Sequence, residues 1–273
     1  MRLIPLGRLA GMPAGGQASS GYLVEHGETR LMLDAGPGTA ANLSLHLGDR
    51  PLSGAFVSHL HTDHILDVLP VGKMALTRRL RGDRATGRIE VDESVPRVPL
   101  FVPAGAGAVL DRYAALFPVA TQPVLDRAFG LGFEVIEYQP GQVYAAGDLS
   151  LRLALLRHAA PNCGVRVEAG GHSLVYTGDT GVTPALPELA RGADLLLSES
   201  TLRETDPTTH GHLSSRDAAE VADEAGVGAL VLTHFADHDP AEHEWHRAAA
   251  AKVFGGSVDV ARIGHTYRVG LLR

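Results

Sequence analysis

The sequence of 273 residues contains one cysteine, Cys163. A single cysteine cannot form an intramolecular disulfide, and it cannot supply the several thiolates of a cysteine-based zinc site. No stretch approaches the ~20 consecutive apolar residues that a membrane-spanning helix needs. These absences favour a reducing compartment and predict a cytoplasmic protein without a membrane partner.

Positive charge is in deficit, since 24 Lys and Arg stand against 31 Asp and Glu and leave a net charge of −7. Such a balance gives no general affinity for polyanions, so we expect no DNA partner. A Walker-type phosphate loop is also missing, because no Lys-Ser or Lys-Thr pair follows the glycines of residues 34–38.

The first residues, MRLIPLGRLAGMPAGGQASSGYLV, place a basic residue ahead of apolar ones, as an export signal does. Gly7 and Arg8 interrupt the apolar run, which is too short for the core of a signal. We therefore interpret this stretch as a first strand followed by a glycine-rich loop.

Hydrophobic residues make up 45% of the chain, enough to bury the core of one large domain. Short apolar runs between turns predict strands at residues 22–24, 31–33, 54–58, 100–102, 133–138, 149–156, 164–168 and 173–177. Capping and periodic signals predict helices at residues 39–47, 68–80, 107–117, 183–192 and 214–226. Two sets of strands flanked by helices, with no linker, predict a single α/β domain over residues 1–273 in which two sheets pack between helical layers.

Residues 78–98 are charged and show no clear period. Basic residues, among them Arg78, Arg84, Arg88 and Arg97, alternate there with acidic ones. The segment is either a lid that attracts an anionic substrate or a solvated loop, and its composition does not separate these alternatives.

The segment SHLHTDHILD, residues 58–67, concentrates histidine and aspartate at the end of a predicted strand. His59 and His61 are two residues apart, so their side chains face the same way and can reach one metal ion. Asp63 and His64 follow one turn later and point toward a second ion. The spacing predicts two half-built metal sites whose remaining ligands come from elsewhere in the chain.

Three later apolar runs end in a residue that could complete these sites. LLRHAAPNCG contains His158, LVYTGDTG contains Asp179 and LVLTHF contains His234. Side chains at the ends of strands can converge at the mouth of a sheet. We therefore expect these three residues to lie beside the histidines of residues 58–67.

Together these residues resemble the ligand set of the metallo-β-lactamase fold superfamily. The segments LDAGPGT, TGDTG, SEST, GHLSS and LTHF resemble the branch of that superfamily that contains ribonuclease Z and cyclic-nucleotide phosphodiesterases. The resemblance covers about residues 1–270. It implies an αββα sandwich of two mixed sheets that carries two metal ions at one edge.

The resemblance also implies a role for each candidate ligand. His59, His61 and His158 would bind one ion, Asp63, His64 and His234 the other, and Asp179 would bridge them. Imidazole and carboxylate ligands without thiolate suit two Zn²⁺ ions, with Mn²⁺ or Fe²⁺ as alternatives. The ions would hold a bridging hydroxide as the nucleophile, and Asp63 would also orient it.

Glu199 and His212 form the next pair that the resemblance implies. Glu199 would hold His212, and His212 would contact a phosphoryl oxygen or protonate the leaving alkoxide. Classical β-lactamases lack this pair, so its presence favours a phosphoester. Otherwise Glu199 merely ends a strand and His212 precedes a helix cap. Asp34 resembles a residue that holds a ligand histidine through its other ring nitrogen.

The histidines near the C-terminal helix and beside His212 are not expected to bind metal. We expect His243 and His246 on the solvated face of a polar helix that begins at Asp239. His238 and His210 are expected nearest the cleft, whereas Cys163 is expected in the core.

The connection between His158 and Asp179 bears on the substrate. Ribonuclease Z carries a long arm for tRNA there, whereas this chain has only a predicted hairpin turn at residues 169–172. We therefore expect a phosphodiesterase that acts on a small or cyclic phosphodiester, such as a cyclic nucleotide, rather than on tRNA. The alternatives are a hydrolase of esters, lactones or thioesters, a tRNA 3′-processing endonuclease, and a non-catalytic metal-binding protein. The resemblance also makes a homodimer plausible.

Overall fold

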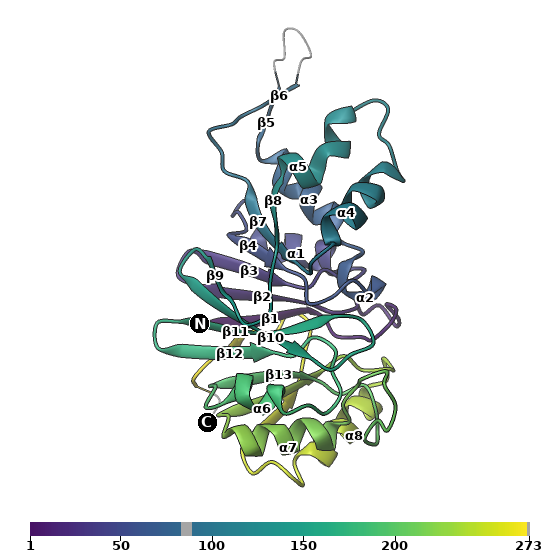
Figure 1. Cartoon of the computed structure of the whole chain (residues 1–273), viewed down its shortest axis with the longest axis vertical. Coiled ribbons are helices and arrows are strands. Elements are labelled where there is room, and N and C mark those ends of the chain that lie inside the picture. The colour runs from purple at the N-terminus through teal and green to yellow at the C-terminus, as the bar shows by residue number, and fades with distance from the viewer. Residues whose placement is uncertain (83–88, 272–273) are drawn as a thin grey trace.

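The computed structural model describes residues 1–82 and 89–271 (Figure 1). Two seven-stranded sheets pack face to face, and helices cover both outer faces. This arrangement confirms the predicted αββα sandwich of two mixed sheets.

The first sheet has the strand order β16-β1-β2-β3-β4-β7-β8. Its strands are β1 (Arg2–Gly7), β2 (Gly21–His26), β3 (Thr29–Leu33), β4 (Gly54–Phe56), β7 (Val98–Val102), β8 (Phe133–Glu137) and β16 (Tyr267–Arg268). The helices on its outer side are α1 (Thr39–Leu47), α2 (Thr62–Ile65), α3 (Val68–Thr77), α4 (Ala106–Ala115), η1 (Pro123–Arg127) and α5 (Ala128–Leu131).

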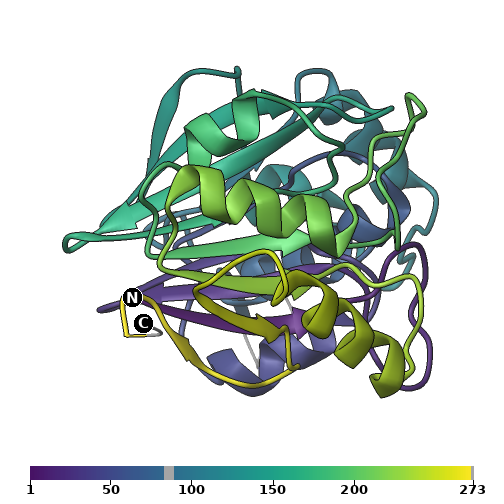
Figure 2. The ribbon, with the colours of Figure 1, turned by 90° about the horizontal axis from the view of Figure 1, so that it is seen from below.

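The second sheet has the strand order β15-β14-β13-β12-β11-β10-β9. Its strands are β9 (Val143–Ala146), β10 (Leu149–Leu156), β11 (Asn162–Ala169), β12 (His172–Tyr176), β13 (Leu195–Glu199), β14 (Ala229–Thr233) and β15 (Ser257–Val260). Figure 2 shows the helices outside this sheet, which are α6 (Ala185–Ala190), α7 (Ser215–Ala225) and α8 (Pro240–Ala250).

Strands in the middle of each sheet are buried along their whole length. Every residue of β3 and β13 is buried, because one face of each strand meets the other sheet and the opposite face meets helices. Aromatic side chains such as Tyr22, Phe56 and Tyr176 fill the space between the sheets. This packing makes the two sheets one scaffold for the polar segments at their edges.

The strands that precede the candidate ligands end at one edge of the sandwich. Strands β3, β4, β7 and β8 are parallel to one another, as are β12, β13 and β14. Strand β10 runs in the same direction as β12, since both are antiparallel to β11. The segments after β4, β10, β12, β13 and β14 therefore emerge together on the side of α2, whereas both termini lie at the other side (Figure 1).

The charged segment contains a two-stranded hairpin, β5 (Leu80–Gly82) with β6 (Ile89–Val91). It projects from the end of α3 and precedes β7, so its base lies at the edge opposite the candidate ligands (Figure 1). Within it, Arg79 pairs with Glu93 at 2.7 Å and Arg81 pairs with Asp92 at 3.0 Å. Arg84 and Arg88 lie outside the described residues. The described part of the segment thus does not cover the cluster of candidate ligands.

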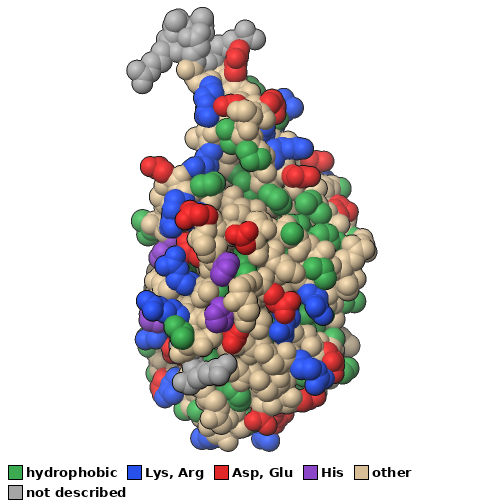
Figure 3. Space-filling view, turned by 90° about the vertical axis from the view of Figure 1, so that its left-hand side faces the viewer, with side chains coloured by type: hydrophobic (Ala, Val, Ile, Leu, Met, Phe, Trp, Pro, Cys, Tyr) green, Lys and Arg blue, Asp and Glu red, His purple; other side chains and the backbone are tan. Residues whose placement is uncertain are grey.

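The face opposite the candidate ligands carries charges of both signs. Figure 3 shows acidic and basic side chains interspersed over it rather than gathered by sign. No helix of the described residues is long and apolar enough to cross a membrane.

Two predicted helices differ from the structure at their ends. Helix α7 lies within the predicted range 214–226 and has a capping box, in which the Ser214 side chain accepts from the Asp217 backbone; it ends at Gly226 in the left-handed region. Helix α6, predicted over residues 183–192, begins only at Ala185 and has no side-chain cap. The 68–80 helix ends earlier than predicted, at Thr77, because the chain then enters β5.

The prediction for two histidines of α8 was wrong. His243 and His246 are only 2% and 4% exposed, not solvated. Their rings pack against Phe235, with centroids 4.3 and 5.4 Å away. The apolar face of α8 is short of aliphatic residues, so the imidazole rings supply the packing surface.

Candidate metal centre

The first cluster of candidate ligands gathers His59, His61, His158 and Asp179. One ligand atom from each lies within 4.8 Å of the others. His61 Nδ1 is 3.1 Å from His158 Nε2, and Asp179 Oδ2 is 3.6 Å from His59 Nε2. The structure therefore brings together the residues predicted for one ion.

The second cluster gathers Asp63, His64, Asp179 and His234 under the same limit of 4.8 Å. His64 Nε2 and His234 Nε2 are 3.2 Å apart, and each lies 3.2 Å from Asp179 Oδ1. Asp63 Oδ2 is 3.2 Å from His234 Nε2. These are the residues predicted for the other ion.

Asp179 belongs to both clusters. Its Oδ2 atom faces His59 and His158, whereas its Oδ1 atom faces His64 and His234. Burial alone would raise the pKa of this carboxyl, but His234 and His64 hold it well below its ordinary value, so it is ionised. The carboxylate is positioned as a bridge between two ions would be.

The opposite ring nitrogens are held by polar neighbours. Nδ1 of His64 bonds Asp34 at 2.7 Å, Nδ1 of His158 bonds the Gly211 carbonyl at 2.9 Å and Nδ1 of His234 bonds the Thr201 hydroxyl at 2.7 Å. A neutral imidazole that donates Nδ1–H in this way presents a lone pair at Nε2. These contacts therefore aim three Nε2 atoms into the clusters as metal ligands.

The residues fit a divalent cation better than a network of hydrogen bonds. Facing imidazole nitrogens lie 3.1 and 3.2 Å apart, and a cation between two neutral rings would satisfy the lone pairs of both. Nε2 of His59 and Oδ1 of Asp179 are buried and have no hydrogen-bond partner within the described part of the chain. Burial, with His64 close by, also holds the pKa of His59 well below its ordinary value, so its ring is neutral and able to coordinate.

Backbone strain gathers at this centre. Asp34 and His234 have φ of 55° and 59°, and they are the non-glycine residues with left-handed φ among those described. Gly36 is required by close approach, because a Cβ atom there would lie 1.9 Å from the Asp63 carbonyl oxygen. The loop after β3 is thus shaped to bring Asp34 and Asp63 together.

Glu199 and His212 form the predicted pair beside the clusters. His212 Nδ1 lies 3.0 Å from Glu199 Oε1, and the His212 ring lies 5.2 Å from that of His158 and 5.6 Å from that of His234. Burial alone would lower the pKa of His212, but the hydrogen bond and charge of Glu199 raise it to about 8. At neutral pH His212 is therefore mostly protonated and can donate a proton into the cleft.

The structure adds residues that the sequence interpretation missed. Thr201 donates to Glu199 at 2.7 Å while it bonds His234, so it links the acid pair to a candidate ligand. The backbone N–H of Gly11 donates to Asp63 at 2.7 Å, and the Tyr176 hydroxyl donates to Asp34 at 2.6 Å. Only Thr201 had a signal in the sequence, since it is part of SEST.

Two other histidines were expected near the cleft. The exposed His210 ring lies 4.8 Å from that of His212 and 5.7 Å from that of His158, so it borders the centre. The side chain of His238 is 53% exposed and pairs with Asp237 at 3.5 Å, outside both clusters. Cys163 is buried in the core between the sheets, as expected.

Comparison with known proteins settles the family. Residues 29–235 match the family described as "Beta-lactamase superfamily domain". The chain belongs to this superfamily. It is 28% identical to "Probable metallo-hydrolase YhfI" of Bacillus subtilis, over 98% of this chain and 99% of that protein. It is also 30% identical to a ribonuclease Z of Mycobacterium marinum, over 97% of each chain.

Solved structures agree with this assignment. The metallo-β-lactamase fold protein YhfI from Bacillus subtilis has a TM-score of 0.79 and 27% identity, covering 97% of this chain and 98% of its own. A diphosphatase of the PhnP family shares the fold, with a TM-score of 0.72, 17% identity and coverage of 98% and 97%. The predicted family and fold are confirmed, and the protein is a metallo-hydrolase with a divalent metal centre.

Proposed function

We propose that the protein is a binuclear metal-dependent phosphodiesterase that hydrolyses a small or cyclic phosphodiester. Its two clusters, which share Asp179, would each hold one ion. Two Zn²⁺ ions suit the imidazole and carboxylate donors, with Mn²⁺ or Fe²⁺ as alternatives. When bound, the ions supply an activated water nucleophile and positive charge opposite the phosphoryl oxygens.

The Glu199–His212 pair is the observation that carries this proposal. Phosphodiester cleavage expels an alkoxide, and expulsion is faster when an acid protonates the leaving oxygen. His212 uses Nδ1 for Glu199, so its Nε2–H remains for the substrate. Glu199 is itself fixed, because the Thr180 backbone donates to it at 2.6 Å. The pair is thus a held imidazolium beside the metal ligands.

The short path from His158 to Asp179 supports a small substrate over tRNA. Strands β11 and β12 are joined directly by the turn at Gly170 and Gly171, so no arm extends there. Relatives named ribonuclease Z keep tRNA 3′ processing as the second candidate function. Hydrolysis of esters, lactones or thioesters is the third, since an activated water also attacks a carbonyl.

One panel of substrates tests the proposal. Protein loaded with zinc or manganese should hydrolyse bis(p-nitrophenyl) phosphate, and at least one small or cyclic phosphodiester, faster than it trims a precursor tRNA. Faster tRNA cleavage would replace the proposal with the nuclease. Hydrolysis of lactones or thioesters without phosphodiesterase activity would replace it with the third candidate. Inactivity across the panel, with two ions bound by elemental analysis, would indicate a non-catalytic metal-binding protein.

A further inference from the structure

An apolar pocket of about 300 Å³ lies at the same edge of the sandwich as the metal centre. It is built from the segments that follow β4, β7 and β8 and from the β10–β11 connection. Its lining includes Leu60, Ala104, Tyr138, Leu155, Ala160 and Cys163. This volume is at the lower end of the range of ~300–1,000 Å³ that small-molecule pockets occupy.

The pocket is lined by residues that adjoin ligands of the first cluster in the chain. Leu60 stands between His59 and His61, and Ala160 follows His158 by two residues. The same two segments therefore carry the ligands and one side of the pocket. The pocket and the metal centre are thus built in part from the same two segments of the chain.

The polar side-chain atoms that line the pocket are not available to bind a polar ligand. The Tyr138 hydroxyl donates to the carbonyls of Val57 at 3.0 Å and Ser58 at 2.7 Å. Burial raises the pKa of the Cys163 thiol to about 11, so it stays neutral. The remaining lining side chains are hydrocarbon, and Leu155 is 54% exposed at the rim. A nucleobase would find no side-chain donor or acceptor here to match its polar edge.

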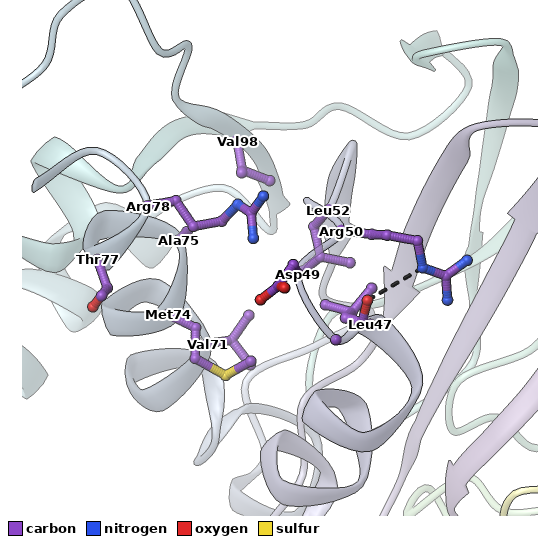
Figure 4. A pocket seen from close by; sticks show the side chains of 11 residues that line it. Leu47, Asp49, Arg50, Leu52, Val71, Met74, Ala75, Thr77, Arg78 and Val98 are labelled. Atoms are coloured by element: carbon purple, nitrogen blue, oxygen red, sulfur yellow. Dashed lines mark hydrogen bonds between the residues drawn. The ribbon is translucent and has the colours of Figure 1, made fainter.

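A second hollow, of about 390 Å³, lies at the opposite edge between the ends of α1 and α3 (Figure 4). One of its charged side chains serves the fold, since Arg50 bonds the Leu47 carbonyl at 3.2 Å at the end of α1. Because Leu52 and Val98 in its lining precede β4 and begin β7, this hollow is remote from the metal centre. Of these two cavities, the apolar pocket is the one built from segments that also carry candidate ligands.

We propose that the apolar pocket binds an alkyl or aryl substituent of the substrate while the phosphoryl group lies at the metal centre. The natural substrate is then a phosphodiester with a hydrocarbon group rather than a nucleotide. This inference rests on the proposed phosphodiesterase function and narrows its substrate class. Leu155 and Ala104 determine the preference, because both line the pocket without belonging to either ligand cluster.

Phosphonates with a single substituent test the pocket without turnover. Isothermal titration of the metal-loaded protein with phenylphosphonate, methylphosphonate and thymidine 5′-monophosphate should give the tightest binding for phenylphosphonate. We expect it to exceed methylphosphonate by roughly 10- to 100-fold, as burial of one aromatic ring predicts. Leu155→Ser and Ala104→Trp should each remove most of this ratio while methylphosphonate affinity stays unchanged. Val143→Ser is the matched control, because Val143 is a 57% exposed apolar residue on β9 outside the pocket.

The outcomes separate this inference from the proposed function. Equal binding of the two phosphonates, or a ratio that survives both pocket variants, would overturn the pocket assignment while hydrolysis of bis(p-nitrophenyl) phosphate still supported the phosphodiesterase. Tightest binding of thymidine 5′-monophosphate would show that the site takes a nucleotide. If no phosphonate bound and no phosphodiester were cleaved, the proposed function and this inference would both fail.

Discussion

The Oδ2 atom of Asp34 lies 2.7 Å from Nδ1 of His64, and this contact determines which nitrogen of the ring faces the metal centre. Asp34 is only 1% exposed, and it also accepts hydrogen bonds from the Ser58 backbone at 2.6 Å and the Tyr176 hydroxyl at 2.6 Å. The carboxylate thus joins the loop after β3, the segment after β4 and the end of β12. It positions His64 from outside the cluster.

Asp34→Asn should weaken metal binding without removing a ligand. Asparagine keeps the shape but loses the charge that supports the imidazole, so we expect affinity for the more weakly held ion to fall by roughly 10- to 100-fold. Competition with a chromogenic chelator measures this. Asp111→Asn, an exposed position on α4, is the control and should bind metal as the native protein does. Unchanged affinity in Asp34→Asn would show that the contact does not support the ligand.

Replacement of Asp179 should disturb both ions at once. Asp179→Ala removes one oxygen from each cluster, whereas His61→Ala removes a ligand from the first cluster only. Elemental analysis after gel filtration should therefore find both ions depleted in Asp179→Ala and about one ion retained in His61→Ala. Retention of full metal content by Asp179→Ala would refute the bridging assignment.

Loss of the acid pair should slow turnover but spare the metal. We expect His212→Ala to bind its full complement of ions and to hydrolyse bis(p-nitrophenyl) phosphate roughly 10²- to 10⁴-fold more slowly. Glu199→Gln should lower kcat in the same sense, and the double variant should be little worse than His212→Ala, because the two residues act as one unit. Additive losses in the double variant would contradict that coupling.

The candidate ligands could be predicted because each stands at the end of an apolar run. Strand direction then decides which ends meet, and the parallel pairing of β12, β13 and β14 brings Asp179, Glu199 and His234 to one edge. Among the residues that position them, Asp34 was implied by the resemblance, whereas Gly11 and Tyr176 could not be found in the same way. Gly11 acts through its backbone N–H, which any residue type could supply. Tyr176 fits the hydrophobic pattern of a buried strand, and that pattern does not indicate the hydrogen bond that its hydroxyl donates to Asp34.

The missed features share a physical cause, which is that tertiary packing overrides local pattern. His243 and His246 lie in a polar stretch, yet Phe235 from the segment after β14 gives their rings an apolar neighbour. Strands β5 and β6 lack alternation of apolar and polar residues, because their hairpin projects from the body and has little core to face. The burial of these histidines and the formation of this hairpin depend on contacts between segments that are distant in the sequence.

The buried His246 should make the protein less stable in acid. Burial lowers the pKa of His246 from 6.5 to about 4, with Glu242 opposing the shift, so the ring is neutral in the folded state at pH 5 to 6. The unfolded ring takes up a proton near pH 6.5, and this favours unfolding as the pH falls from 6.5 toward 4. The loss is at most about 3 kcal/mol, at ~1.4 kcal/mol for each unit of pKa.

Urea denaturation of the metal-free protein at pH 7.5, 6.5 and 5.5 should therefore show a shallower loss of stability in His246→Gln than in the native protein. His265→Gln is the control, because His265 is exposed and its replacement should leave the slope unchanged. Equal slopes for His246→Gln and the native protein would mean that His246 is protonated in the folded state or does not contribute to acid sensitivity.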